Sequence, residues 1–144
     1  MSRLIVCEKT GRWAAALRRA AGSCELPLVE VRSLEQLERE LIDSPAAMAA
    51  VEVSAASLVR VATHVAAWRS RFAGSAILLL ADEELQPLEA PLREVGVVHA
   101  AFSPRDLSGM VRLIRRHLAR APRPALTLEG SILARLPWPA VNSG

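Results

Sequence analysis

Residues 95–118, which read VGVVHAAFSPRDLSGMVRLIRRHL, decide the fold predicted for this chain. Gly96 is a typical helix terminator, and the apolar run Val97–Phe102 after it has the length of a strand. The pair Ser103–Pro104 predicts a turn, and the apolar residues beyond it recur at helical spacing. The stretch therefore predicts a strand, a turn and an amphipathic helix from about Pro104 to Arg120.

Four similar strand–helix units precede this one. Apolar runs of strand length are Arg3–Cys7, Leu26–Val31, Ala46–Val53 and Ala76–Ala81. The helices between them are expected to begin at Thr10 or Gly11, at Ser33, at Ser57 and near Leu88. Alternating strands and helices imply right-handed crossovers and a parallel sheet.

The spacing of particular side chains predicts where these helices are capped, which side they bury and where one is distorted. Ser33 followed by Gln36 is a capping-box pattern, and the helix it opens carries Leu34, Leu37, Leu41 and Ile42 at helical spacing. The next helix carries an apolar stripe of Leu58, Val61, Ala62, Val65, Trp68 and Phe72. Two prolines, Pro87 and Pro91, predict that the fourth helix is short, late or distorted near Leu88–Val95.

The predicted fold class is α/β, a three-layer doubly wound sheet of five parallel strands in the order 2-1-3-4-5. In such folds chemistry is placed at the carboxyl ends of the strands. Four segments follow those ends and are the first candidates for a site: 7–10, 52–55, 81–83 and 102–105.

The length of 144 residues suits one domain, expected at 1–121. A change of composition at Ala121–Ala125 predicts a linker, so residues 122–144 are expected to form a proline-containing tail with a short helix near Thr127. Trp138, between two prolines, is a candidate anchor for a partner. The tail could instead pack on its own domain.

Composition narrows the functional classes. Hydrophobic residues make up 51% of the chain, which is enough for a core, but only 3% of residues are aromatic, which disfavours stacking on single-stranded nucleic acid. The two cysteines have no metal-like spacing, and no secretory or membrane-spanning segment is apparent, so a reduced, cytoplasmic protein is expected. Residues 104–144 hold an excess of arginine over acid, so the last helix is expected to present a basic surface.

The body of the chain resembles the receiver domain of response regulators in two-component systems. That resemblance implies an acidic pair after the first strand, an acceptor Asp after the third, a Thr or Ser after the fourth, and Lys-Pro after the fifth. At the corresponding positions this chain has Cys7 and Glu8, Glu52, Ala81, and Ser103–Pro104. Only Glu8 retains a side chain suited to the ancestral role, and Lys9 or Arg105 is a candidate to replace the lost Lys.

These departures lead to the interpretation that the chain is a degenerate receiver, or pseudo-receiver. We expect a non-catalytic signalling module with no cofactor and no bound metal, which contacts a protein partner or forms a homodimer. The expected surface comprises the fourth helix, the fifth strand and the fifth helix, with Arg112, Arg115, Arg116 and Arg120. Glu52 could mimic a phosphorylated acceptor, or it could retain some phosphorylation.

Two other classes of function remain open at this stage. The first is a flavodoxin-like enzyme or small-molecule binder that uses Cys7, Glu8, Glu52 and Ser103. The second is a nucleic-acid accessory factor that uses the basic last helix and Arg123.

Overall fold

The computed structural model describes residues 3–22, 26–105 and 107–120. The predictions for the tail at 122–144, including Trp138 and Arg123, lie outside the described residues. Within the described part, five parallel strands form one sheet in the order β2-β1-β3-β4-β5, as the alternation of strands and helices predicted. The strands are β1 (Leu4–Cys7), β2 (Leu28–Val31), β3 (Met48–Val53), β4 (Ala76–Ala81) and β5 (Val97–Ala101).

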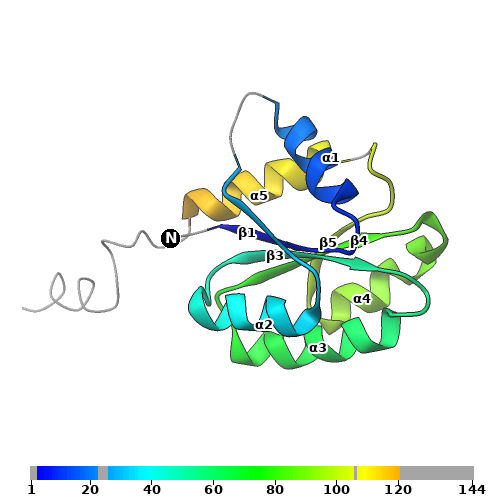
Figure 1. Ribbon diagram of the computed structural model, residues 1–144. Helices are drawn as coiled ribbons and strands as arrows, with labels where there is room; N and C mark the ends of the chain where they lie inside the picture. The colour runs from blue at the N-terminus through cyan, green and yellow to red at the C-terminus, as the bar shows by residue number, and fades with distance from the viewer. Residues whose placement is uncertain (1–2, 23–25, 106, 121–144) are drawn as a thin grey trace, which may run out of the picture.

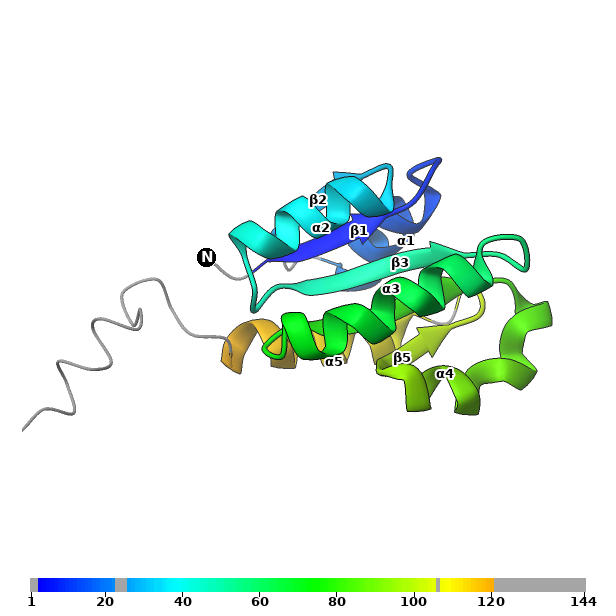
Figure 2. The same ribbon diagram turned by 90° about the horizontal axis from the view of Figure 1, so that it is seen from below.

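Helices cover both faces of this sheet. The helices α1 (Arg12–Ala21) and α5 (Ser108–Arg120) lie on one face, and α2 (Leu34–Asp43), α3 (Leu58–Arg71) and α4 (Glu89–Val95) lie on the other (Figure 1). Figure 2 shows the sheet from the side of α3, with β3 running beneath that helix. The molecule therefore has the three layers expected of a doubly wound fold.

Two apolar cores follow from the alternation of side chains along each strand. Ile5, Val51 and Leu79 face α2, α3 and α4, whereas Leu4, Val6 and Leu80 face α1 and α5. All six side chains are buried. The central strand β4 is buried along its whole length, which explains its continuous apolar sequence.

Several predicted element boundaries shift in the structure. β2 begins at Leu28 and not at Leu26, because Pro27 before it has no N–H to donate. α5 begins at Ser108, later than the expected Pro104. Ile42, the last of the apolar residues at helical spacing on α2, is half exposed. It lies at the last turn of α2, beside Leu41, which takes the inward position.

The segment around the two prolines is distorted, as predicted. A 3₁₀ helix at Glu83–Leu88 contains Pro87, and α4 follows it directly with Pro91 in its first turn. Proline is tolerated there because the first amides of a helix have no intrahelical acceptor. Gly96 ends α4 with φ of 131° and donates its N–H to Arg93 O and Leu92 O.

β5 contains an irregularity that the sequence did not indicate. Ile77 pairs with Val97, but the next residue, Leu78, pairs with His99. Val98 is therefore a bulge residue at the edge of the sheet, and 45% of its surface is exposed.

Candidate functional site

The sequence places its candidate residues where β1, β3 and β4 end, at what we call the carboxyl edge of the sheet. Cys7 and Val51 are register partners on β1 and β3, and Val53 pairs with Ala81 on β4. The structure therefore brings Cys7, Glu8, Glu52 and Ala81 to the same edge. Ser103 and Pro104 lie farther along, in the loop after β5, where Ser103 Oγ accepts the Arg105 N–H at 3.2 Å.

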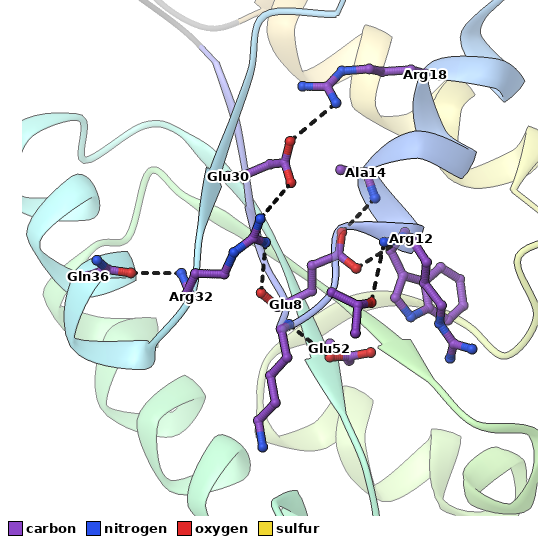
Figure 3. Close-up of polar contacts among 11 residues, drawn as sticks. Glu8, Arg12, Ala14, Arg18, Glu30, Arg32, Gln36 and Glu52 are labelled. Carbon is purple, nitrogen blue, oxygen red and sulfur yellow. Dashed lines mark hydrogen bonds and ion pairs between the residues drawn. The ribbon is translucent and has the colours of Figure 1, made fainter.

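Glu8 has a role that the sequence analysis did not foresee. Its side chain is 2% exposed, and its two carboxylate oxygens accept the N–H groups of Trp13 at 2.9 Å and Ala14 at 2.6 Å. These amides belong to the first turn of α1 (Figure 3). Helix N-termini favour negative charge and need acceptors for their amides, so Glu8 caps α1 from outside the helix.

Gly11 explains why a distant residue must provide this cap. It occupies the N-cap position with φ of 89° and has no side chain that could accept a hydrogen bond. Only glycine adopts this left-handed conformation without strain. The chain therefore turns sharply at Gly11, which brings the start of α1 onto the Glu8 carboxylate.

Cys7 is a buried free thiol at the same edge, with 6% of its surface exposed. Burial raises the pKa of this thiol from 9.0 to about 11, and the negative charges of Glu52, Glu35 and Glu8 add to the increase. Cys7 is therefore a neutral thiol at physiological pH.

Glu52 is half buried at the end of β3, and its Oε1 accepts the backbone N–H of Lys9 at 3.2 Å. This bond joins the end of β3 to the loop after β1. The ion pairs among the described residues include none between Glu52 and the side chain of Lys9 or Arg105. The expected replacement for the receiver Lys is thus not formed in the described part of the chain.

The arrangement does not fit the magnesium ion that a receiver fold implies. Mg²⁺ requires oxygen ligands, preferably carboxylates, but Cys7 presents a thiol and both oxygens of Glu8 accept helix amides. Among the residues that the structure describes, no group of three or more His, Cys, Asp or Glu side chains is placed to hold a metal ion.

A cavity of about 500 Å³ opens at this edge, between the ends of β1 and β3 and the first turns of α2 and α3. Cys7, Glu8 and Glu52 line it, as the small-molecule alternative expected, but Ser103 does not. The cavity wall also contains Ser54 and Asp82, from the candidate segments 52–55 and 81–83, and four polar residues that were not predicted there, namely Arg32, Ser33, Ser57 and Arg60. A ligand in this cavity remains a prediction.

Arg32 was missed because the end of β2 was not considered among the candidate segments. Its guanidinium donates to the Glu8 backbone carbonyl at 3.1 Å and to Glu30 Oε1 at 3.4 Å, and Glu30 also pairs with Arg18 at 3.2 Å (Figure 3). The Arg32 N–H donates to Gln36 Oε1 at 2.7 Å. These contacts fix Arg32 at the cavity rim.

Ser57 was expected to begin α3, and the structure confirms its position but not a capping bond from its side chain. It does occupy the N-cap position, but its side chain makes no capping bond to the helix. Instead its Oγ accepts the Ser54 N–H at 3.0 Å, which closes the loop between β3 and α3.

Comparison with known proteins supports the fold. Neither protein-family models nor curated proteins match the sequence. Among solved structures, the chain is similar to the crystal structure of a CheY-like protein (TadZ) from Pseudomonas aeruginosa PAO1, with a TM-score of 0.62 and 20% sequence identity. The match covers 85% of this chain and 98% of that one. The fold is therefore receiver-like.

Proposed function

We propose that this chain is a cytoplasmic pseudo-receiver, a regulatory module that acts through protein–protein contacts and does not accept a phosphoryl group in the usual way. The observation that carries the proposal is the state of Glu8. In a receiver this position helps to bind the cation, but here the carboxylate is buried and holds the amides of Trp13 and Ala14. Its partner in the acidic pair is the neutral thiol of Cys7.

The other positions support the same proposal. Phosphoryl transfer depends on groups that neutralise the charge on the transferring phosphoryl oxygens. Ala81 is buried and has no hydroxyl to offer, and Ser103 stands where a receiver has Lys. Glu52 is left without the cation and the ammonium group that would make it a good acceptor.

Phosphotransfer can be tested directly. The full chain is incubated with magnesium and a small phosphodonor such as acetyl phosphate, and its intact mass is measured beside that of Glu52→Gln. We expect no phosphoryl adduct on either protein, while a catalytically complete receiver treated in parallel gains one. An adduct on the wild-type chain that Glu52→Gln lacks would show that Glu52 is an acceptor and would overturn the proposal.

Glu52 has a second proposed role, which is to hold the carboxyl edge in one conformation. Support comes from its bond to the Lys9 N–H, which links β3 to the loop before α1. Glu52→Asp shortens the side chain and should lose this bond, whereas Glu52→Gln keeps an acceptor. If Glu52 mimics a phosphorylated acceptor, Glu52→Asp should change self-association or partner affinity, and unchanged behaviour would count against the mimicry.

The proposed contact surface consists of α4, β5 and α5. Its support is the partial exposure of two apolar side chains, Leu88 before α4 and Val98 on β5, beside the exposed Arg112 and Arg116 of α5. Arg115 was also expected to be available, but its Nη2 donates to the Ala21 carbonyl at 2.6 Å and so contributes to packing against α1. The side chain of Arg120 lies outside the described residues.

The simplest form of the proposal is a homodimer through this surface. Light scattering over a range of concentrations, at low and high salt, measures the oligomeric state of the chain. A chain that stays monomeric under all of these conditions would refute the dimer and leave a different protein as the proposed partner.

A further inference from the structure

Charged residues are separated between the two helical layers of the molecule. α1 and α5, which share one face of the sheet (Figure 1), contain seven arginines and no acidic residue. On the other face, α2, α3, the 3₁₀ segment and α4 together contain eight acidic residues and five arginines. One layer is thus uniformly basic, and the other carries charges of both signs.

Three arginines form the centre of the basic layer. Arg112 and Arg116 lie four residues apart on α5, so they share the exposed side of the helix opposite the buried Met110 and Ile114. Arg19 is exposed on α1. Within the described part of the chain, these three side chains are in no ion pair. We call Arg19, Arg112 and Arg116 the α1/α5 basic face.

Neighbouring arginines of α1 and α5 have partners within the molecule, and one of them links the two helices. Arg115 of α5 donates to the last residue of α1, Ala21. Arg18 pairs with Glu30 on β2, and Arg12 lies 3.8 Å from Asp82. Surface ion pairs of this kind are weak, typically below about 1 kcal/mol, so Arg12 and Arg18 can also turn toward an anionic partner.

The chemistry of the face indicates what it can bind. No large apolar side chain is exposed on the described residues of α1 or α5, so the face offers nothing to insert into a membrane or to form an apolar interface. Its aromatic residue, Trp13, is buried, so unpaired bases have no ring to stack on. What remains is guanidinium, which suits phosphate and carboxylate groups.

The spacing of the arginines along α5 favours a partner with regularly repeated negative charges. Arg112 and Arg116 are separated by one turn of helix, about 6 Å along its axis. Along one strand of duplex DNA each phosphate lies about 3.4 Å farther along the axis than the last, and the winding of the strand makes the direct distance between neighbouring phosphates larger than this axial step. The two guanidinium groups can therefore contact neighbouring phosphates of one strand. We propose that the α1/α5 basic face, which shares Arg112 and Arg116 with the proposed protein contact surface, binds the backbone of double-stranded nucleic acid without reading its sequence when no protein covers it.

Fluorescence anisotropy with a labelled 20-base-pair DNA duplex of mixed sequence tests this proposal on the full chain. At physiological salt we expect a Kd of roughly 1–100 µM, and tighter binding at about 50 mM salt. If four phosphates are contacted, the affinity should fall about 100-fold between 50 and 200 mM salt. Vesicles containing phosphatidylserine, tested at the same salt, measure binding to an anionic lipid surface.

Matched variants separate this face from net charge. Arg112→Ala/Arg116→Ala should weaken duplex binding by roughly ten-fold and lower the salt slope by about 2. Arg39→Ala/Arg71→Ala removes the same charge from α2 and α3 and should leave binding nearly unchanged. A second pair, Arg19→Ala/Arg112→Ala, should act like the first. All of these side chains are exposed, and thermal unfolding of each variant confirms that it is folded.

Three results would overturn the proposal. The first is the absence of duplex binding at 50 mM salt. The second is an equal loss of binding in the variants of the two faces, which would mean that only net charge matters. The third is binding to the vesicles as tight as binding to the duplex, which would assign the face to a membrane surface.

Discussion

Glu8 connects the local structure of α1 to the proposed loss of phosphotransfer, because the carboxylate that caps the helix stands where a receiver binds its cation. A carboxylate after β1 can ligate a cation or cap α1, and in this chain its two oxygens accept the amides of Trp13 and Ala14. Because Gly11 offers no capping side chain, α1 depends on Glu8. In this chain Glu8 thus has a structural role.

We predict that Glu8→Ala lowers the free energy of unfolding by about 2–3 kcal/mol, since it leaves two buried helix amides without acceptors. Urea denaturation measures this value. Glu35→Ala provides the control, because Glu35 pairs with Arg60 at the exposed surface and should change stability by less than about 0.5 kcal/mol. A Glu8→Ala variant as stable as the control would show that the cap is unimportant.

The raised pKa of Cys7 leads us to predict that the protein loses stability at alkaline pH. Its folded-state pKa of about 11 lies above the ordinary value of 9.0, so the unfolded chain releases the thiol proton first. The stabilisation that the Cys7 thiol gives to the folded state is complete below pH 9. It is lost as pH rises from 9 to 11, by up to about 1.4 kcal/mol per pH unit.

The measurement is urea denaturation at pH 8 and pH 10.5 for wild type and Cys7→Ala. The stability difference between the two proteins should shrink at the higher pH, by about 2 kcal/mol. A constant difference would mean that the thiol titrates alike in both states.

At the residue scale, the sequence predicted which positions meet but not what each side chain does. Cys7, Glu52 and Ala81 reach the carboxyl edge because strand ends can be located from apolar runs. The capping role of Glu8 could not be predicted from spacing. Its carboxylate reaches the Trp13 and Ala14 amides only because the chain turns at Gly11. Arg32 was equally hidden, because its position depends on Glu30 and on the Glu8 carbonyl.

At the scale of single elements, α2 follows its sequence most closely. Ser33 Oγ accepts the Gln36 N–H at 3.1 Å, as the capping-box pattern predicted. The Gln36 side chain bonds to the N–H of Arg32, one residue before the cap. Local patterns of this kind can be read reliably because both partners lie within one turn.

We predict that Ser33→Ala destabilises the protein by about 1 kcal/mol through loss of this cap. Ser70→Ala, on the exposed side of α3, should have almost no effect. Thermal unfolding of the two variants is compared with that of wild type. Equal stability of the two variants would contradict the assigned role of Ser33.

Elements were predicted less well where tertiary contacts override local preference. The β5 bulge at Val98 is not visible in the apolar run Val97–Phe102, because nothing in that run distinguishes the residue that leaves the ladder. Ser57 lacks a capping bond for a related reason. Its hydroxyl has two possible partners, the α3 amides and the Ser54 N–H, and loop geometry selects the second.

At the scale of the whole molecule, the strand order and the two-layer helix arrangement could be predicted, because parallel crossovers leave few topologies open. A homodimer through the fourth helix, the fifth strand and the fifth helix stays a prediction, since association depends on which apolar side chains remain exposed. The Val98 bulge matters here because it interrupts the free edge of β5 and so opposes continuous strand pairing between molecules.

We predict that the proposed dimer packs through side chains on α4, β5 and α5, so Val98→Glu should shift it to monomer. Val59→Glu is the matched control, since Val59 is 77% exposed on α3, outside the proposed surface. Sedimentation velocity at several concentrations measures the change. Dissociation by Val59→Glu but not by Val98→Glu would move the interface to the α3 side.

If the chain is a pseudo-receiver, as we propose, the capping of α1 by Glu8 also limits how it could regain phosphotransfer. Replacing Cys7 with Asp would restore an acidic pair in sequence, but the neighbouring carboxylate would still be tied to the Trp13 and Ala14 amides. Any route back to a working phosphate switch must first give α1 a cap of its own, for instance through Gly11→Ser together with a relaxed turn. Loss of the switch would then be hard to reverse by single substitutions, because one side chain has become part of the scaffold.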